Sequence, residues 1–414
     1  MRGVLPNDCF ALPPGVDWVP VDDAKGRLLS RLTAVAEIET CSVAAALGRV
    51  LANSVTACRP HPAHRNAAVD GFAVRLDDGE RTEYGLVDGA AAAGHPSDYV
   101  LRPGEAIRIL TGAEVPDATD AVVLQEDVSV RDQRVYLPGP PKPGANIRSR
   151  GEDTAEGAVI LEKGHRLTVR DLAYAISVGV ERVECFKPLK VGVISSGDEI
   201  VPPGADARAH QVFDANRPML LSQVLNWGYE AINLGHVGDD RKAVERALRE
   251  AVAQCDAVIT SGGASAGAED HISAVLGDLA DRHTWRIALK PGRPLALAQW
   301  DGVPIFGLPG NPIAAFVCTL IFARPALQLL QGRKLSEPQG YDLPAAFAKT
   351  KKPGRTEYLR ARVNADGAVE VFGSEGSGRV SGLSWAEGLV GLPHGAVDIK
   401  PDDKVRYLPF SSFD

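Results

Sequence analysis

The feature of this chain that most constrains its fold is a regular alternation of strand-like and helix-like segments over residues 187–332. Short apolar, β-branched runs such as VGVISS, DAVIT and VPIFGLP alternate with amphipathic stretches, of which residues 241–254 carry their apolar side chains on one stripe. Such alternation is typical of βαβ units, which place parallel strands side by side through right-handed crossovers. Residues 184–333 are therefore predicted to form a central, mostly parallel α/β domain.

Upstream of this domain the pattern changes. Residues 1–18 are rich in proline and turn-forming residues and are predicted to be a loose extension. Helix-like periodicity places residues 19–57 and 140–183 in a helical or linker domain, and residues 22–51 are expected to be largely helical.

Two further regions have the short strands and tight turns of β structure. They predict a β-rich insert over residues 58–139 and a C-terminal β-barrel or sandwich over residues 334–414. The expected fold class is therefore a multidomain α/β protein, with the α/β domain at its centre.

The stretch CDAVITSGGASAGAEDHI, residues 255–272, joins a predicted strand to a predicted helix through glycines. Glycine allows a tight turn and lets a ligand approach backbone N–H groups, while the helix dipole favours negative charge. Phosphate is the expected ligand, but Glu269 and Asp270 would repel it unless a cation such as Mg²⁺ lies between them. Helix capping is the alternative, since the spacing matches neither GxGxxG nor the P-loop.

Acidic residues follow a glycine after three of the predicted strands. These residues are Asp198 and Glu199, Asp239 and Asp240, and Glu269 and Asp270. The carboxyl ends of neighbouring parallel strands open on one crevice, where ligands bind. The three turns therefore predict a phosphate site bridged by a cation.

Cationic side chains that could hold an anion occur in WRIALKPGRP, as Arg286, Lys290 and Arg293. In the following GLPGNP segment, Gly310 and Asn311 form a turn and Pro312 begins a helix, which predicts a second anion pocket. The sequence has no GxSxG or HExxH motif, so chemistry by a metal and positioned charge is favoured over a covalent nucleophile.

Composition excludes several classes of protein. A net charge of −8 without a long basic stripe argues against nucleic-acid binding. The six cysteines form no CxxC pair, which indicates neither a zinc site nor a disulfide framework and favours the cytoplasm. The first residues lack the apolar run of a signal peptide, and the longest apolar run, residues 312–330, is interrupted by Arg324 and Pro325. That run is predicted to be a buried helix rather than a membrane span.

Three polar residues upstream have no clear role by themselves. Asp70 precedes Gly71, Thr111 follows the strand-like segment RIL, and Asp153 lies in a glycine-dense loop. Ordinary turn formation or solvated charge explains these residues as well as a functional site does.

Taken together, SGDEI, VGDD, TSGGASAGAED, KPGRP and GLPGNP resemble the motifs of the MoeA-type molybdopterin molybdenumtransferases, the family that includes the gephyrin E-domain. HRNAAVDGFAV, RILTGAEVP and GANIRSRGED are similar to earlier motifs of the family, and the resemblance covers residues 22–414. It implies a homodimeric enzyme that binds adenylylated molybdopterin, releases AMP in a Mg²⁺-dependent step and inserts molybdate. The enzyme that adenylylates molybdopterin is a further expected partner.

The resemblance also implies roles for individual residues. The expected catalytic residues are Asp70, Thr111, Asp153, Glu199 and Lys290, and the expected metal ligands are Asp239 and Asp270. Asp70 and Thr111 are expected to position molybdate, facing the α/β domain of the partner subunit. Substrate binding is expected from Ser261, Gly262, Gly263, Ser265, Arg286, Arg293, Pro309, Gly310, Asn311 and Pro312.

The chain departs from the family pattern at several positions. Ala67, Ala68 and Val69 precede Asp70 where Ser-Ala-Met is usual, arginines replace lysines at positions 286 and 293, and His271 replaces an aromatic hydroxyl residue. A pterin-binding or scaffolding paralogue with weakened catalysis therefore stays open, as do insertion of tungstate and use of Mn²⁺. Another α/β enzyme acting on a nucleotide is disfavoured by the missing P-loop.

Overall fold

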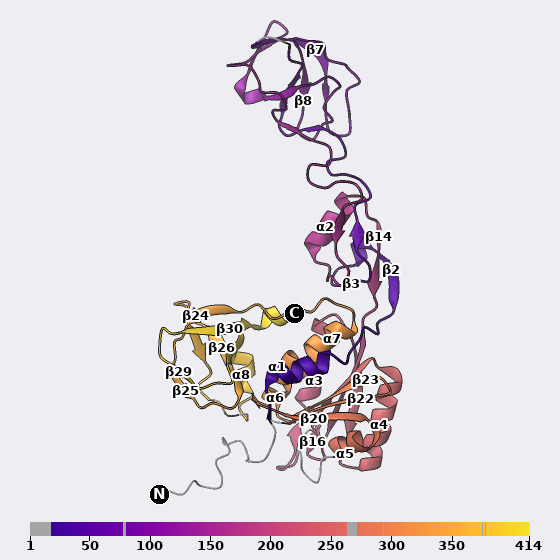
Figure 1. Cartoon of the computed structure of the whole chain (residues 1–414), viewed down its shortest axis with the longest axis vertical. Helices are drawn as coiled ribbons and strands as arrows, with labels where there is room; N and C mark the ends of the chain where they lie inside the picture. The colour runs from indigo at the N-terminus through magenta and orange to yellow at the C-terminus, as the bar shows by residue number, and fades with distance from the viewer. Residues whose placement is uncertain (1–17, 78–79, 263–270, 293, 375, 377) are drawn as a thin grey trace. The chain divides into compact units, whose positions relative to one another are not determined.

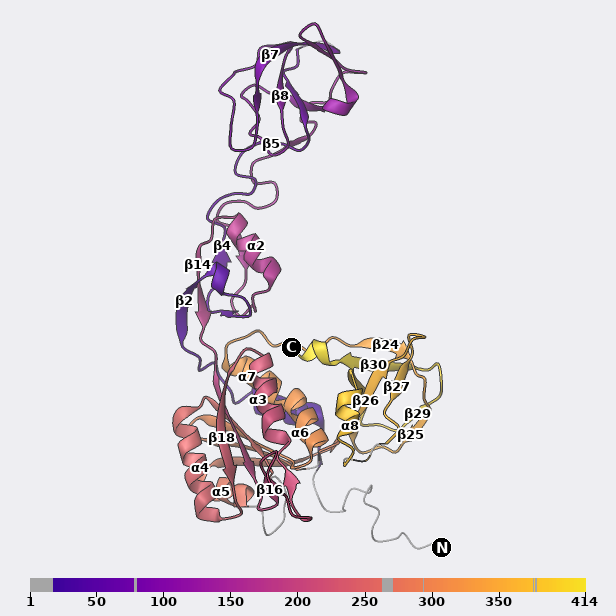
Figure 2. The same cartoon turned by 180° about the vertical axis from the view of Figure 1, so that it is seen from behind.

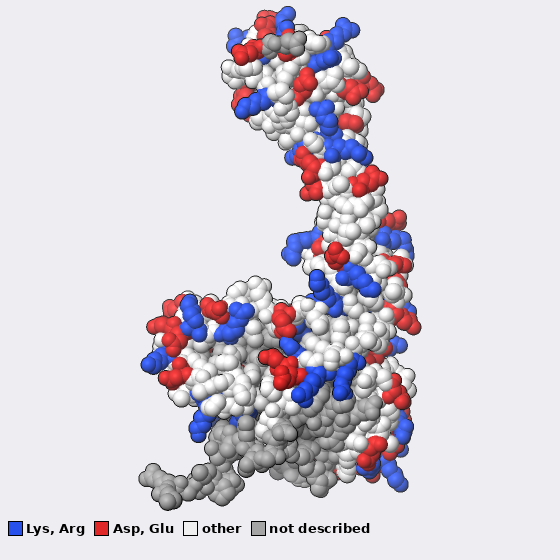
Figure 3. Space-filling view, in the orientation of Figure 1, with Lys and Arg blue, Asp and Glu red and all other residues white. Residues whose placement is uncertain are grey.

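The computed structural model describes residues 18–77, 80–262, 271–292, 294–374, 376 and 378–414. These residues divide into two compact units. The α/β unit contains the residues up to Glu39, Gly48–Ala52 and Cys185–Asp414, and the insert unit contains Thr40–Leu47 and Asn53–Glu184. On the face shown in Figure 3, the basic and acidic side chains of the described residues are interspersed, in keeping with a sequence that has no basic stripe.

A seven-stranded sheet forms the centre of the α/β unit. Its order is β1 (Trp18–Val19), β20 (Asp281–Ile287), β22 (Pro294–Trp300), β23 (Val303–Leu308), β19 (Ala257–Ser261), β15 (Lys190–Ser196) and β18 (Glu230–Val237). Strands β23, β19, β15 and β18 run parallel, which confirms the predicted mostly parallel sheet. Strand β22 is antiparallel to both β20 and β23, because the short segments between these strands leave no room for a crossover helix.

Helices cover both faces of this sheet (Figures 1 and 2). One face carries α1 (Val21–Leu29), α3 (Asn216–Asn226), α6 (Pro312–Cys318) and α7 (Arg324–Leu330). The other face carries α4 (Arg241–Gln254) and α5 (His271–Leu279). In β19, Ile259 packs in the first core and Val258 in the second, because successive side chains of a strand point to opposite faces. This is why β19 is buried along its whole length rather than at alternate residues.

The apolar run 312–330 is one helical segment, in which a π-helical stretch, Thr319–Ala323, joins α6 to α7. The segment is 19 residues long with a mean hydropathy of 1.9, enough to cross a membrane by length and composition, yet most of it is buried inside the unit. Arg324 is buried with it, and its guanidinium donates to the carbonyl oxygens of Phe413 and Ser336. The segment is therefore a core helix, as predicted.

The C-terminal part of the α/β unit is a second, six-stranded sheet. Its strands are β21 (Leu289–Lys290), β26 (Thr356–Val363), β28 (Gly388–Leu392), β30 (Lys404–Pro409) and β24 (Tyr341–Pro344), with β27 (Val369–Val371) also on β26. A small sheet of β25 (Lys349–Lys351) and β29 (Val397–Ile399) accompanies it. Strand β21 comes from the KPGRP segment and pairs Lys290 with Glu357, so a predicted site residue belongs to this sheet.

The insert unit is built on another six-stranded sheet. Its order is β10 (Ser129–Arg131), β11 (Arg134–Tyr136), β7 (Glu83–Ala91), β8 (Glu105–Ile109), β6 (Gly71–Val74) and β9 (Ala121–Leu124). The unit also contains α2 (Val169–Ser177), where Thr168 and Asp171 form a capping box. The insert unit is thus rich in β structure, and the strands of its main sheet lie between Gly71 and Tyr136.

The expectation that residues 22–51 are largely helical is wrong beyond Leu29. This region contains β2 (Ile38–Ser42), a 3₁₀ turn at Val43–Ala45 and β3 (Val50–Leu51). Strand β3 pairs antiparallel with β14 (Arg182–Phe186), whose residues lie far along the chain. Such long-range pairing overrides local periodicity, which depends only on sequence neighbours.

Candidate functional site

The carboxyl ends of β15 and β18 bring two of the predicted acidic turns together. The backbone N–H of Asp198 donates to Asp239 Oδ2 at 3.1 Å, and that of Asp239 donates to Asp198 Oδ1 at 3.0 Å. The carboxylate of Glu199 folds back over Gly197, whose φ of +132° favours glycine and where an added Cβ would clash with that carboxylate. Glycine before the acids therefore allows the carboxylates to gather at this edge.

Asp240 has a structural role that differs from the role of its neighbour Asp239. Its Oδ1 accepts a hydrogen bond from the backbone N–H of Ala243 at 2.7 Å, which caps α4. In the VGDD motif, capping thus accounts for Asp240, whereas Asp239 faces the acidic turn at the end of β15.

The acids at this edge offer oxygen ligands, which suit Mg²⁺ or Mn²⁺. In the part of the chain that the structure describes, no group of three or more His, Cys, Asp or Glu side chains is arranged to hold a metal by itself. Mg²⁺ usually takes one or two carboxylates together with substrate phosphates. The described acids therefore fit a cation shared with a phosphate better than an all-protein metal site.

Several predicted site residues lie outside the described residues. They are Asp270, Gly263, Ser265 and Arg293. For Arg286 only the backbone is described, in β20, where it pairs with Trp18 of β1.

Two glycine turns lie next to the acidic edge, at the ends of β19 and β23. Gly262 has a φ of +93°, and a Cβ there would lie 2.7 Å from the carbonyl oxygen of Ser196. A Cβ at Gly310 would lie 3.9 Å from the Cα of Gly262, so the two turns are adjacent. Glycine is needed at Gly262 because of this close backbone approach as well as its positive φ.

The turn at Gly310 leads into α6, which begins at Pro312 with Asn311 as its N-cap; Pro309, Asn311 and Pro312 are half-buried. Asn311 Oδ1 accepts hydrogen bonds from Ile313 N at 3.1 Å and from Ala314 N at 3.3 Å. The cap therefore occupies two of the N–H groups on which the predicted second anion pocket depends.

Sequence reasoning missed the residues that tie these turns to α3. Asn216 Nδ2 donates to Ser261 Oγ and to the carbonyl oxygen of Gly310, both at 2.7 Å. Asp214, also buried, accepts from Ser195 Oγ at 2.5 Å and from Arg217 Nε at 2.9 Å. The local signal was an Asp three residues before an Arg at the start of a predicted helix, a common capping arrangement.

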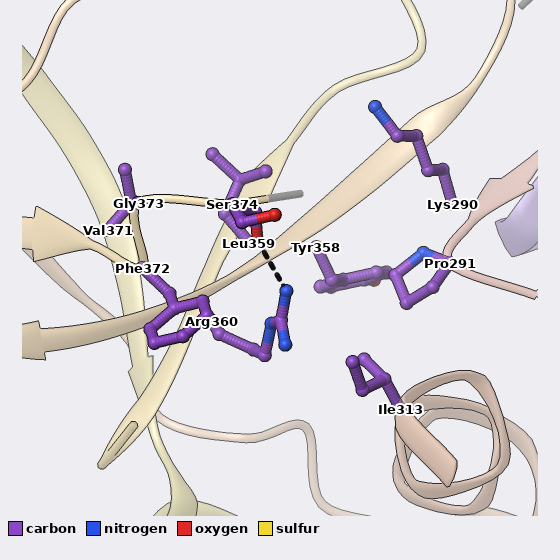
Figure 4. Close-up of a pocket in the computed structure, with 10 residues that line it drawn as sticks. All are labelled: Lys290, Pro291, Ile313, Tyr358, Leu359, Arg360, Val371, Phe372, Gly373 and Ser374. Atoms are coloured by element: carbon purple, nitrogen blue, oxygen red, sulfur yellow. Dashed lines mark hydrogen bonds between the residues drawn. The ribbon is translucent and has the colours of Figure 1, made fainter. Parts of the chain in front are cut away.

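Lys290 lies at a cavity of about 190 Å³ that sequence reasoning did not predict (Figure 4). Pro291, Ile313 and Tyr358 line it, together with Arg360 of β26. Lys290 Nζ lies 3.4 Å from Glu357 Oε2, so its charge is partly offset.

The guanidinium of Arg360 is held on several sides at this cavity. It lies 4.8 Å from the ring centre of Phe372 and donates to the carbonyl oxygens of Ser374 at 2.6 Å and Arg379 at 2.7 Å. Burial lowers the pKa of Arg360. In the sequence EYLRARV this arginine looks like any polar residue of an alternating strand, so no local signal marked it.

In the insert unit, the structure brings Asp70 and Thr111 together. Asp70 Oδ1 accepts hydrogen bonds from the backbone N–H and from Oγ1 of Thr111, both at 2.7 Å. Those bonds, with a smaller contribution from the charge of Arg108, hold the pKa of Asp70 below its ordinary value. Asp153 lies on another loop, where its N–H donates to the carbonyl oxygen of His61 at 3.1 Å.

The geometry can be compared with known proteins. Residues 19–179 match the MoeA N-terminal region (domain I and II), residues 192–329 match a probable molybdopterin binding domain, and residues 342–410 match the MoeA C-terminal region (domain IV). A solved structure of the molybdopterin biosynthesis MoeA protein from Pyrococcus horikoshii has a TM-score of 0.84 at 26% identity, covering 95% of this chain and 100% of its own.

Curated relatives match over nearly the whole length. The molybdopterin molybdenumtransferase of Haemophilus influenzae is 34% identical over 397 residues, which is 94% of this chain and 98% of that protein. The enzyme of the same name from a Nostoc species is 30% identical over 395 residues, which is 92% of this chain and 91% of that protein. By these matches, the chain belongs to the MoeA family of molybdopterin molybdenumtransferases, which are transferases of molybdenum cofactor biosynthesis.

Proposed function

We propose that this transferase inserts molybdate into adenylylated molybdopterin and releases AMP in a Mg²⁺-dependent step. The observation that carries the proposal is the shared edge at the ends of β15, β18, β19 and β23. There, the carboxylates of Asp198, Glu199 and Asp239 lie beside the glycine turns at Gly262 and Gly310. Glycine turns suit a phosphate, whereas carboxylates beside a phosphate require a cation.

Within this site the residues divide the work by chemistry. The glycine turns would let the pterin or its phosphates approach the backbone closely, and Lys290 with Arg360 would offset the negative charge of the substrate. Mg²⁺ would be held by Asp239 and Asp270, with Glu199 nearby. The bound ion would neutralise part of the negative charge of the phosphate. The small cavity at Lys290 and Arg360 is a natural place for an anionic part of the substrate.

Asp70 and Thr111 would position molybdate or its attacking oxygen. Since its hydrogen bonds favour the ionised form, Asp70 is available near neutral pH to accept a proton or a hydrogen bond. Thr111 Oγ1 already donates to Asp70 and would orient the carboxylate. Asp153 is the third proposed catalytic residue of the insert unit, and its backbone N–H donates to the carbonyl oxygen of His61.

A cytoplasmic homodimer is part of the proposal. On α2, apolar residues at the helical spacing of i, i+3, i+4 and i+7 form one stripe of Val169, Leu172, Ala173 and Ile176. Val169 is 64% exposed and Ile176 is 53% exposed. Such a stripe favours contact with a second copy of the chain, which would allow residues of two subunits to share a site.

The proposal is tested by AMP release from adenylylated molybdopterin, measured with and without Mg²⁺ and molybdate. Release should need both, and Asp239→Asn should slow it roughly 10–100-fold, because a proposed metal ligand is weakened. Asp240→Asn is the matched control, since that residue caps α4. The same assay with Mn²⁺ in place of Mg²⁺, and with tungstate in place of molybdate, tests the alternative ions.

Full release without Mg²⁺ would refute the proposed metal dependence. Tight binding without release would instead indicate a pterin-binding paralogue that has lost the insertion step.

A further inference from the structure

Asn216 has an unusual hydrogen-bonding state for a buried amide. Only 7% of the residue is exposed, at the start of α3 beneath the two glycine turns. Its Nδ2 uses both hydrogens, donating to Ser261 Oγ and to the carbonyl oxygen of Gly310 at 2.7 Å each. Its Oδ1 has no hydrogen-bond partner among the described residues.

The orientation of this amide is determined by Gly310. A backbone carbonyl oxygen only accepts hydrogen bonds, so rotating the amide would bring two acceptors together. The unpartnered group is therefore the acceptor Oδ1. Buried polar groups in folded proteins nearly always have a partner, so an unpartnered one calls for a partner such as a water, an ion or a ligand.

The surroundings of Asn216 allow a ligand to supply that partner. Ser261 Oγ accepts from Asn216, which leaves the serine hydroxyl hydrogen available to a second acceptor. A Cβ added at Gly310 would meet, among the described residues, only Gly262 Cα within 4 Å, so the turn has open space beside it. The unpartnered acceptor of Asn216 and the hydroxyl of Ser261 thus belong to one hydrogen-bonded group with the Gly310 turn.

We infer that Asn216 recognises the bound substrate, with Oδ1 accepting a hydrogen bond from an N–H or O–H group of the ligand while Nδ2 holds the two glycine turns together. The inference rests on the proposed function and deepens it. In adenylylated molybdopterin this donor is either the amino group of the pterin ring or a ribose hydroxyl of the adenylyl group. Both present the same chemistry to an amide oxygen.

The test compares ligand pairs that differ in one donor. Pterin is paired with lumazine, which has an oxygen in place of the 2-amino group, and AMP is paired with 2′-deoxy-AMP and 3′-deoxy-AMP. Affinities of the full-length protein are measured by titration calorimetry or ligand-observed NMR. The wild type should prefer the donor-bearing member of one pair by about tenfold, and that pair identifies the recognised group.

Two variants separate recognition from a purely structural role. Asn216→Ala removes Oδ1 and Nδ2, and it should abolish the preference within the pair. Asn216→Asp removes Nδ2 but keeps an acceptor oxygen, so it should retain the preference even if overall binding weakens. If Asn216 only held the turns, both variants would weaken binding to both members of each pair equally.

The wild type alone can also overturn the inference, whether or not the variants fold. Equal affinities within both pairs, together with normal AMP release from the full substrate, would refute recognition by Asn216 and leave the proposed function intact. A folded wild type that binds neither pterin nor AMP and releases no AMP would overturn both.

Discussion

At the scale of single residues, the pKa of Asp70 is lowered by a residue that is distant in the sequence. Thr111, 41 positions away, donates two hydrogen bonds to one carboxylate oxygen, and these favour the ionised form. Because the pKa of Asp70 is lowered in the folded state, this interaction stabilises the fold above the ordinary pKa of an aspartate. The stabilisation is lost as the pH falls through the lowered value.

We expect Thr111→Val to raise the pKa of Asp70 toward its ordinary value, because one of the two hydrogen bonds disappears while the backbone N–H still donates. A pH titration of the aspartate carboxyl carbons by NMR measures this shift. Thr111→Ser keeps the hydroxyl and serves as the control. An unchanged pKa in the valine variant would show that the Oγ1 bond does not contribute.

At the scale of secondary-structure elements, the two aspartates of the VGDD motif separate into a site residue and a cap. Asp240 accepts from Ala243 N at the start of α4, and Asp239 interacts with the turn after β15. Two adjacent aspartates thus have different roles: Asp240 caps a helix, and Asp239 belongs to the candidate site. Their side chains differ in direction, which the sequence alone does not show.

Asp240→Ala should lower the free energy of unfolding by about 1 kcal/mol, because α4 loses its N-cap. Asp239→Asn should leave stability nearly unchanged. Urea denaturation followed by circular dichroism measures both, and Asp240→Ser, which can still cap, is the control. Equal losses for Asp239→Asn and Asp240→Ala would contradict this division of roles.

At the scale of the whole molecule, the proposed homodimer predicts that a charge introduced into the apolar stripe of α2 weakens dimerisation. Ile176→Glu should shift the mass in solution toward that of a single 43.9-kDa chain, because burying an unpaired carboxylate is unfavourable. Light scattering after size-exclusion chromatography measures the mass.

Leu225→Glu is the matched control for that experiment, because Leu225 is 59% exposed on α3 in the other unit. A monomeric wild type would refute the homodimer. A dimer that tolerates Ile176→Glu would place the interface away from α2.

Much of the fold and part of the site could be predicted from the sequence, since these features depend on sequence neighbours. Alternating strands and helices predicted the α/β domain, with α4 over Arg241–Gln254 as expected. The glycine-plus-acid turns were placed at strand ends by the same pattern, and the structure brings Asp198 and Asp239 together there. Periodicity and turn chemistry are local properties, so one sequence suffices to identify them.

Only the tertiary structure decided which distant residues meet. Strand β3 replaces an expected helix because it pairs with β14, and Lys290 lines a cavity together with Arg360 because β21 joins the C-terminal sheet. The amide of Asn216 is oriented by the hydrogen bonds of its Nδ2 to Ser261 and Gly310, and its Oδ1 is left without a partner among the described residues. Such contacts have no local signature in the sequence, because they arise when the packing of the core brings separate segments together.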